Sequence, residues 1–189
     1  SHLWGKNVHE TTDILLRDLA EPDASVACIG QAGENQVRFA SIMVDYDRAA
    51  GRCGGGTVMG AKRLKAIVVD GHGEISAAKP EEFFEAAMEA INAIKVRANK
   101  GLGRHGTLSG LINLNKSGAL PTRNFKTCNF EEAEKVSGQT LSEKYLIKKR
   151  SCFACPIGCG RYIRVPAGDY QTPPHEGAEY ETVDMLGVQ

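Results

Sequence analysis

Residues 65–82 read Lys-Ala-Ile-Val-Val-Asp-Gly-His-Gly-Glu-Ile-Ser-Ala-Ala-Lys-Pro-Glu-Glu, and they contain the change of pattern that decides the fold. The part before Asp70 is rich in β-branched residues, which predicts a strand over residues 65–69. Pro80 and the two glutamates after it suit the first turn of a helix, which we expect to run to residue 98. The glycines between these patterns predict a domain boundary, which we set between residues 74 and 75.

The first domain, residues 1–74, is predicted to be rich in β-structure. Two earlier runs with β-branched residues, 25–29 and 37–46, predict further strands separated by glycine-containing turns. One of these turns, Gly-Gln-Ala-Gly-Glu-Asn at 30–35, has an acid and an amide that either satisfy the turn or bind the polar edge of a cofactor. A short helix is expected before the strands, at about residues 11–20.

The second domain, residues 75–189, is predicted to be helical. After the helix that ends at residue 98, shorter helical runs are expected near 107–116 and 141–150, with loops between them. The last residues, 180–189, predict one more helix. Strands followed by helices assign the chain to the α+β class.

Composition excludes several classes of partner. The chain has 189 residues, 42% of them hydrophobic, as in globular proteins, and its 23 basic and 23 acidic residues cancel. A net charge of zero provides no field that would attract nucleic acid or a membrane surface. No apolar run reaches the roughly 18 residues that span a bilayer, and the first residues lack a signal-peptide pattern, so we expect a cytoplasmic location. Because the chain starts without methionine, we also expect it to be an internal piece of a longer protein.

The sequence Cys152-Phe-Ala-Cys155-Pro-Ile-Gly-Cys159 predicts a metal site. Three thiols within eight residues suit one short loop around a metal, whereas disulfides typify short secreted scaffolds. The spacing favours three of the four thiolates of an iron–sulfur cluster. Zinc is the second interpretation, although no second pair of cysteines or histidines with zinc-site spacing follows, and structural or redox thiols are the third. We expect Cys28, which lies among apolar residues, to be buried.

Residues 51–60 read Gly-Arg-Cys-Gly-Gly-Gly-Thr-Val-Met-Gly and precede three cations, Lys62, Arg63 and Lys65. Glycines allow backbone amides to approach a phosphate, and cations neutralise it. The loop matches neither the Walker pattern nor the dinucleotide fingerprint, so a phosphate site and a plain glycine-rich turn both remain open.

Three carboxylates, Glu176, Glu179 and Glu181, lie next to His175 near the end of the chain. Clustered carboxylates in a pocket of low polarity suit general acid or base catalysis. Acidic residues also favour the solvated first turn of a helix, and both interpretations stay open.

Four segments together resemble the aldehyde:ferredoxin oxidoreductase family of tungstopterin and molybdopterin enzymes: residues 30–40, 48–70, Leu-Pro-Thr-Arg-Asn-Phe at 120–125, and 152–162. Their order along the chain matches the family, and Glu-Tyr-Glu-Thr at 179–182 continues the match. The resemblance implies that residues 1–74 are the C-terminal half of a β-rich pterin-binding domain. It implies that the rest is part of the middle helical domain, which carries the cluster loop.

The resemblance also implies roles for individual residues. Cys152, Cys155 and Cys159 correspond to the first three ligands of a 4Fe–4S cluster, whose fourth ligand comes from a later segment of family members. Glu179, in preference to Glu181, corresponds to an acid near the catalytic metal. The cofactor-binding residues would lie at the pterin phosphates, where a backbone carbonyl near the first two of them would help to hold Mg²⁺. They are Arg52, Cys53, Gly54, Gly55, Gly56 and Lys62.

The function implied is oxidation of a small aldehyde to a carboxylic acid, with ferredoxin as the electron acceptor. The oligomeric state stays open, and a homo-oligomer is one form it can take. One alternative is the tungstopterin subunit of a low-potential reductase, such as an aromatic acyl-CoA reductase. An alternative of another class is a zinc-stabilised binding module without catalysis.

Overall fold

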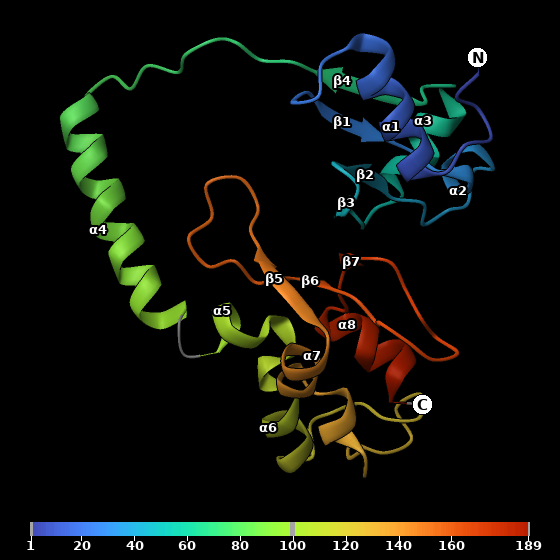
Figure 1. Cartoon of the computed structure of the whole chain (residues 1–189), viewed down its shortest axis with the longest axis vertical. Coiled ribbons are helices and arrows are strands. Elements are labelled where there is room, and N and C mark those ends of the chain that lie inside the picture. The colour runs from blue at the N-terminus through green and yellow to red at the C-terminus, as the bar shows by residue number, and fades with distance from the viewer. Residues whose placement is uncertain (1, 99–100, 189) are drawn as a thin grey trace. The chain divides into compact units, whose positions relative to one another are not determined.

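The computed structural model describes residues 2–98 and 101–188, and the chain divides into two compact units, Ser1–Ile75 and Ser76–Gln189 (Figure 1). We call them the N-terminal and the C-terminal unit. The division lies next to the predicted boundary, and the α+β class is confirmed, with small sheets and many short helices. Within the described ranges, no helix has the length and apolar content needed to cross a bilayer.

The N-terminal unit is built on a four-stranded antiparallel sheet with strand order β3-β2-β1-β4. Cys28 at the end of β1 is fully buried, which confirms the prediction made for it, and its sulfur lies 3.8 Å from Thr12 Oγ1 of helix α1. Asn7 caps α1 and extends it towards the N-terminus relative to the predicted start, because its side chain and that of Glu10 form a capping box. The bounds are α1 Val8–Leu19, β1 Ser25–Cys28, β2 Ile42–Val44, β3 Arg48–Ala50 and β4 Ala66–Val69.

Two short helices, α2 (Gln31–Glu34) and α3 (Gly55–Ala61), complete this unit and approach each other closely. A Cβ atom added at Gly60 would lie 1.8 Å from the carbonyl oxygen of Gly33, and one added at Gly33 would lie 2.9 Å from that of Gly56. The helices therefore pack backbone against backbone, a contact that any side chain at these positions would prevent.

Two local predictions for the N-terminal unit were wrong. The expected strand over residues 37–46 is confined to β2, because Ala40 N–H donates to Val37 O (2.9 Å) and turns the chain first. The expected turn at residues 30–35 contains helix α2, whose amides of Gly33 and Glu34 both donate to the Gly30 carbonyl. These short helices replace extended chain where the glycines permit close packing.

The C-terminal unit begins with the long helix α4, Pro80–Ala98, at the place predicted from Pro80 and its acidic first turn. Short helices then surround an apolar core that is formed by Leu108, Leu111, Leu120, Ala133, Val183 and Val188. The elements are α5 Leu102–His105, η1 Thr107–Gly110, α6 Leu111–Lys116, η2 Ala133–Val136, α7 Gly138–Lys144, α8 Tyr180–Thr182 and the π-helical turn η3 Val183–Gly187.

A second antiparallel sheet, with order β5-β6-β7, lies in this unit and consists of β5 Leu146–Arg150, β6 Gly160–Ile163 and β7 His175–Glu176. It corrects the helix predicted over residues 141–150. Ser137 caps α7 by accepting from Thr140 N–H (3.2 Å), so the helix starts earlier and ends at Lys144. The residues after it pair with β6, and that pairing outweighs their helical pattern.

Gly60→Ala tests the close contact between α2 and α3. The added methyl group would meet the Gly33 carbonyl, so we expect the free energy of unfolding to fall by about 1–3 kcal/mol, as for overpacked interiors. Urea denaturation measures it. Gly73→Ala is the matched control, since no heavy atom lies within 4 Å of a Cβ there. Equal stability of the two variants would contradict the contact.

Candidate functional site

The three predicted metal-binding cysteines lie on the loop that joins β5 to β6, which we call the cysteine loop (residues 151–159). Cys152 is exposed, Cys155 and Cys159 are partly buried, and all three are free thiols. The loop turns back on itself where Cys155 N–H donates to Cys152 O (3.1 Å). Further turning comes from the positive φ angles of Ala154 (52°) and Gly158 (63°). The strand pairing brings both ends of the loop together.

Arg161, on β6, is 2% exposed and anchors the end of this loop. Its Nε donates to Cys159 O (3.1 Å), and one of its terminal nitrogens donates to Gly158 O. The terminal nitrogens also reach three carbonyls of α5, those of Leu102 (3.4 Å), Gly103 (3.3 Å) and Arg104 (3.3 Å). One guanidinium thus joins the cysteine loop to the C-terminal end of a helix 57–59 residues away in sequence.

Gly106 closes the same contact from the side of α5. Its φ of 68° is in the left-handed region, and an added Cβ would lie 2.9 Å from Cys159 O and 3.2 Å from Arg161 Nε. A side chain at this position would therefore push against both the cysteine loop and the guanidinium that holds it.

Glu179 is the predicted acid that the structure brings to the cysteine loop. Its Oε2 accepts from the Thr107 hydroxyl (2.5 Å), and that hydroxyl oxygen also accepts from Tyr180 N–H (2.9 Å). Burial raises the pKa of the Cys159 thiol, and the charge of Glu179, followed by Cys152 and Cys155, raises it further. Thr107 directly follows Gly106, which packs against Cys159 O, so Glu179 is held by the residue next to this contact.

Glu181 has a different setting. It is exposed on α8, and its charge acts on Tyr180 and on the buried Asp184. Burial is the main cause of the raised pKa of the Asp184 carboxyl. The two glutamates predicted as catalytic are thus in different surroundings, and Glu179 is the one beside the cysteine loop.

The cysteine loop fits an iron–sulfur cluster in the kind and spacing of its donors, because such clusters take thiolates from short loops. It falls one thiolate short of a complete set, since Cys128, the fourth cysteine of the C-terminal unit, is exposed and outside the loop. In the described parts of the chain, no three His, Cys, Asp or Glu side chains are gathered into metal-binding geometry. The ligand roles of the three cysteines therefore stay predictions.

The glycine loop of residues 51–56 lies in the N-terminal unit and leads into α3. Arg52 and Cys53 are exposed, and Cys53 and Gly54 both have positive φ angles, 68° and 66°. The glycines are needed for packing, because Cβ atoms at Gly54 and Gly56 would each lie 2.3 Å from a carbonyl oxygen, and one at Gly55 would lie 3.2 Å from Ile42. Close packing accounts for these glycines without a phosphate, and their role in cofactor binding stays a prediction.

The three cations after this loop are not grouped at its exposed start. Lys62 caps the far end of α3, a seven-residue helix, so it lies about 10 Å along the axis from Gly55. Lys65 is buried, and its ammonium forms an ion pair with Glu34, while it also donates to Lys6 O (2.8 Å). Lys65 is therefore part of the fold and is committed to a carboxylate.

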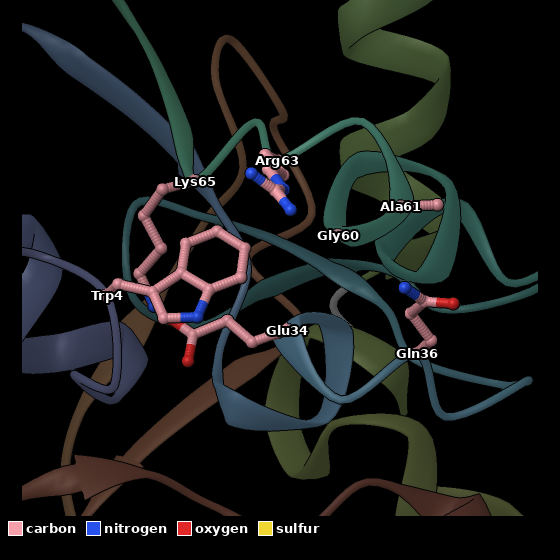
Figure 2. A pocket seen from close by; sticks show the side chains of 7 residues that line it. All are labelled: Trp4, Glu34, Gln36, Gly60, Ala61, Arg63 and Lys65. Carbon is pink, nitrogen blue, oxygen red and sulfur yellow. The ribbon is translucent and has the colours of Figure 1, made fainter. Parts of the chain in front are cut away.

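This buried pair lines a cavity of about 650 Å³ in the N-terminal unit. Figure 2 shows the indole of Trp4 beside Glu34 and Lys65 at one side of the cavity, with Gln36, Gly60 and Ala61 at the other. Both oxygens of Glu34 accept from Gly5 N–H, at 3.0 and 2.9 Å. The polar groups at this wall are satisfied by the protein itself.

Arg161, Thr107 and the Glu34–Lys65 pair were not predicted from the sequence. Arg161 could have been noticed as a cation in an otherwise apolar strand directly after the third cysteine. Its partners at residues 102–104 carry no sequence signal, because they contribute only backbone carbonyls.

Comparisons with known proteins cover the same two parts of the chain. The model of the aldehyde ferredoxin oxidoreductase N-terminal domain matches residues 1–71, and the model of domains 2 and 3 of that enzyme matches residues 82–189. The gap between the two matches includes the boundary between the two units.

Individual relatives give a consistent result. Tungsten-containing aldehyde ferredoxin oxidoreductases are 45% identical in Pyrococcus abyssi and 44% in Thermococcus kodakarensis, and both comparisons cover 100% of this chain. The chain spans 31% of the length of these relatives. A solved structure, the active site complex of benzoyl coenzyme A reductase with 1,5-dienoyl-CoA, contains a chain that is 32% identical. It superposes with a TM-score of 0.72 over 97% of this chain and 29% of the other.

Proposed function

The chain belongs to the aldehyde ferredoxin oxidoreductase family, and we propose that the protein containing it oxidises aldehydes to carboxylic acids and passes the electrons to ferredoxin. The names of the relatives support this reaction, and their identity to the chain, 44–45%, exceeds the 32% of the benzoyl coenzyme A reductase chain. The proposal includes the cytoplasmic location expected from the sequence.

One observation in the structure carries the proposal. The Glu179 carboxylate accepts from Thr107, and the neighbouring Gly106 packs against the Cys159 carbonyl, so the fold places a carboxylate next to the element that contacts the cysteine loop. Thiolates hold metal clusters that move electrons, and a positioned carboxylate moves protons. Aldehyde oxidation releases both, so this site combines the two abilities that the reaction needs.

The cofactors proposed are a tungstopterin, or its molybdenum counterpart, together with a 4Fe–4S cluster and Mg²⁺ at the pterin phosphates. When bound, the metal and pterin would supply the two-electron redox chemistry, and the cluster would supply single-electron transfer. Cys152, Cys155 and Cys159 would provide three cluster ligands. Arg52 and Cys53, which are exposed at the start of the glycine loop, would contact the phosphates, with Lys62 further away.

Oxidation of an aldehyde with water to a carboxylic acid releases two protons and two electrons, and Glu179 would take up one of these protons. The Thr107 hydroxyl donates to its Oε2 and so restricts the rotation of the carboxylate. Its other oxygen, Oε1, would be the atom that exchanges the proton. Glu181 lacks this support and is exposed, so it would play no direct part.

Aldehyde-dependent reduction of a viologen dye tests the reaction. We expect the anaerobically purified protein, complete in metal, to reduce the dye when an aldehyde is added and to form the carboxylic acid. If dye is reduced only with an aromatic dienoyl thioester, the reductase alternative replaces this proposal. Absence of both activities in protein with full metal content would overturn it.

Cys155→Ser tests the cysteine loop. A serine hydroxyl is a poor substitute for a thiolate on iron, so we expect less iron per chain and slower electron transfer to ferredoxin. Cys128→Ser is the matched control, because Cys128 is an exposed thiol of the same unit outside the loop. Iron analysis that finds the same content in both variants would remove Cys155 as a ligand.

Glu179→Gln tests the proton acceptor. The amide keeps the size of the side chain but cannot take up a proton, so we expect kcat for aldehyde oxidation to fall by about 10²-fold or more. Metal and iron contents should stay as in the original protein. Glu181→Gln should leave kcat unchanged, and a larger loss in Glu181→Gln than in Glu179→Gln would reverse the assignment.

A further inference from the structure

We propose that Arg161 is the positioning residue that presents the cysteine loop, and Cys159 in particular, to the iron–sulfur cluster. The inference rests on the proposed function, because it assigns a role towards a group that the cysteines would hold. Arg161 touches neither thiol nor substrate through its hydrogen bonds, and it acts on the backbone that carries the thiols.

The hydrogen bonds of the Arg161 guanidinium connect the cysteine loop to α5. Its hydrogen bonds go to backbone carbonyls, two in the cysteine loop and three in α5. The carbonyls of Gly103 and Arg104 belong to the last turn of α5, where a helix leaves its carbonyls without internal partners. An arginine at such an end donates to these carbonyls and places its positive charge at the negative end of the helix dipole. The same cation then fixes Gly158 and Cys159 relative to this helix end.

The two ends of the cysteine loop are held by different contacts. At its start, Arg150 pairs with Gly160 through the β5–β6 ladder, which fixes the chain just before Ser151. At its end, the two residues before that ladder resumes are Gly158 and Cys159, whose carbonyls accept from Arg161. Between these points Cys152, Phe153 and Ala154 are exposed. The loop thus has an exposed tip and an anchored end, and Cys159 lies at the anchored end.

The guanidinium has little free space around it. Gly106 would place a Cβ 3.3 Å from Arg161 Cγ and 2.9 Å from Cys159 O, so the backbone of the α5–η1 junction packs directly on both. A ligand atom needs its carrier fixed to well under 1 Å for good coordination. A rigid contact between Cys159 and a helix end meets that demand better than a free loop does.

Geometry and charge can be separated, because lysine and arginine carry the same charge. The planar guanidinium has five N–H donors in a fixed fork, whereas an ammonium has three at a single point. A lysine at position 161 would keep a cation beside the loop but could not reach α5 and the loop at once. If the fork of the guanidinium positions the loop, Arg161→Lys loses iron. If only the charge beside the loop matters, Arg161→Lys keeps its iron.

The experiment compares Arg161→Lys with Arg164→Lys in the full-length protein, anaerobically purified. Arg164 is exposed three residues further along the chain and is the matched control. We expect at least a twofold loss of iron per chain in Arg161→Lys, and an altered electron paramagnetic resonance spectrum of the reduced cluster that remains. Tungsten and pterin contents and the thermal midpoint, measured on the same samples, show whether the protein as a whole is folded.

The outcomes separate this inference from the proposed function. If the original protein contains no iron, the proposed function fails. If the original protein holds the cluster and Arg161→Lys keeps both its iron content and its spectrum, the positioning role is overturned.

A second variant decides the case in which Arg161→Lys does not accumulate as folded protein. Gly106→Ala leaves every donor of Arg161 in place, but its methyl group, at a left-handed φ of 68°, would press on both Cys159 O and the guanidinium. Gly110→Ala, where a Cβ meets no atom within 4 Å, is its control. We expect the same loss of iron in Gly106→Ala. Original iron content and spectrum in Gly106→Ala, compared with Gly110→Ala, would overturn the inference.

Discussion

Backbone carbonyls at helix ends and in loops, which need hydrogen-bond donors, are the constraint on which the C-terminal unit depends. Short helices such as α5 and η1 have many terminal carbonyls for their length, and the cysteine loop adds more. The side chain of Arg161 donates to several of these carbonyls. These hydrogen bonds allow a cation to be buried with only 2% of the residue exposed. Hydrogen bonds offset the free-energy cost of burying the guanidinium, and the same hydrogen bonds fix the end of the cysteine loop.

The N-terminal unit depends on a different backbone constraint. There, α2 and α3 approach so closely that Gly33 and Gly60 can carry no side chain. The glycines of the loop at residues 54–56 serve the same packing against residues 38–42. A glycine-rich sequence beside cations therefore has a structural cause here, and Arg52 and Cys53 are the residues of the loop that this packing leaves exposed.

Local rules predicted the elements that local interactions specify. Helix α4 follows from Pro80 and its acidic first turn, and the burial of Cys28 follows from its apolar neighbours. The strand β5 was missed because it is defined by pairing with β6 across the cysteine loop. Arg161 could not be assigned for the same reason, since its partners lie in a helix that the sequence does not connect to the cysteines. The cysteines could be proposed as ligands from the sequence because their spacing is local, whereas the position of Glu179 depends on its hydrogen bond with Thr107, 72 residues away.

We propose that the cysteine loop belongs to a redox site of the aldehyde ferredoxin oxidoreductase family. Elemental analysis of the anaerobically purified protein, combined with pterin fluorescence after denaturation, tests it most directly. We expect tungsten or molybdenum together with iron and a released pterin. Zinc as the sole metal, with neither iron nor pterin, would contradict it.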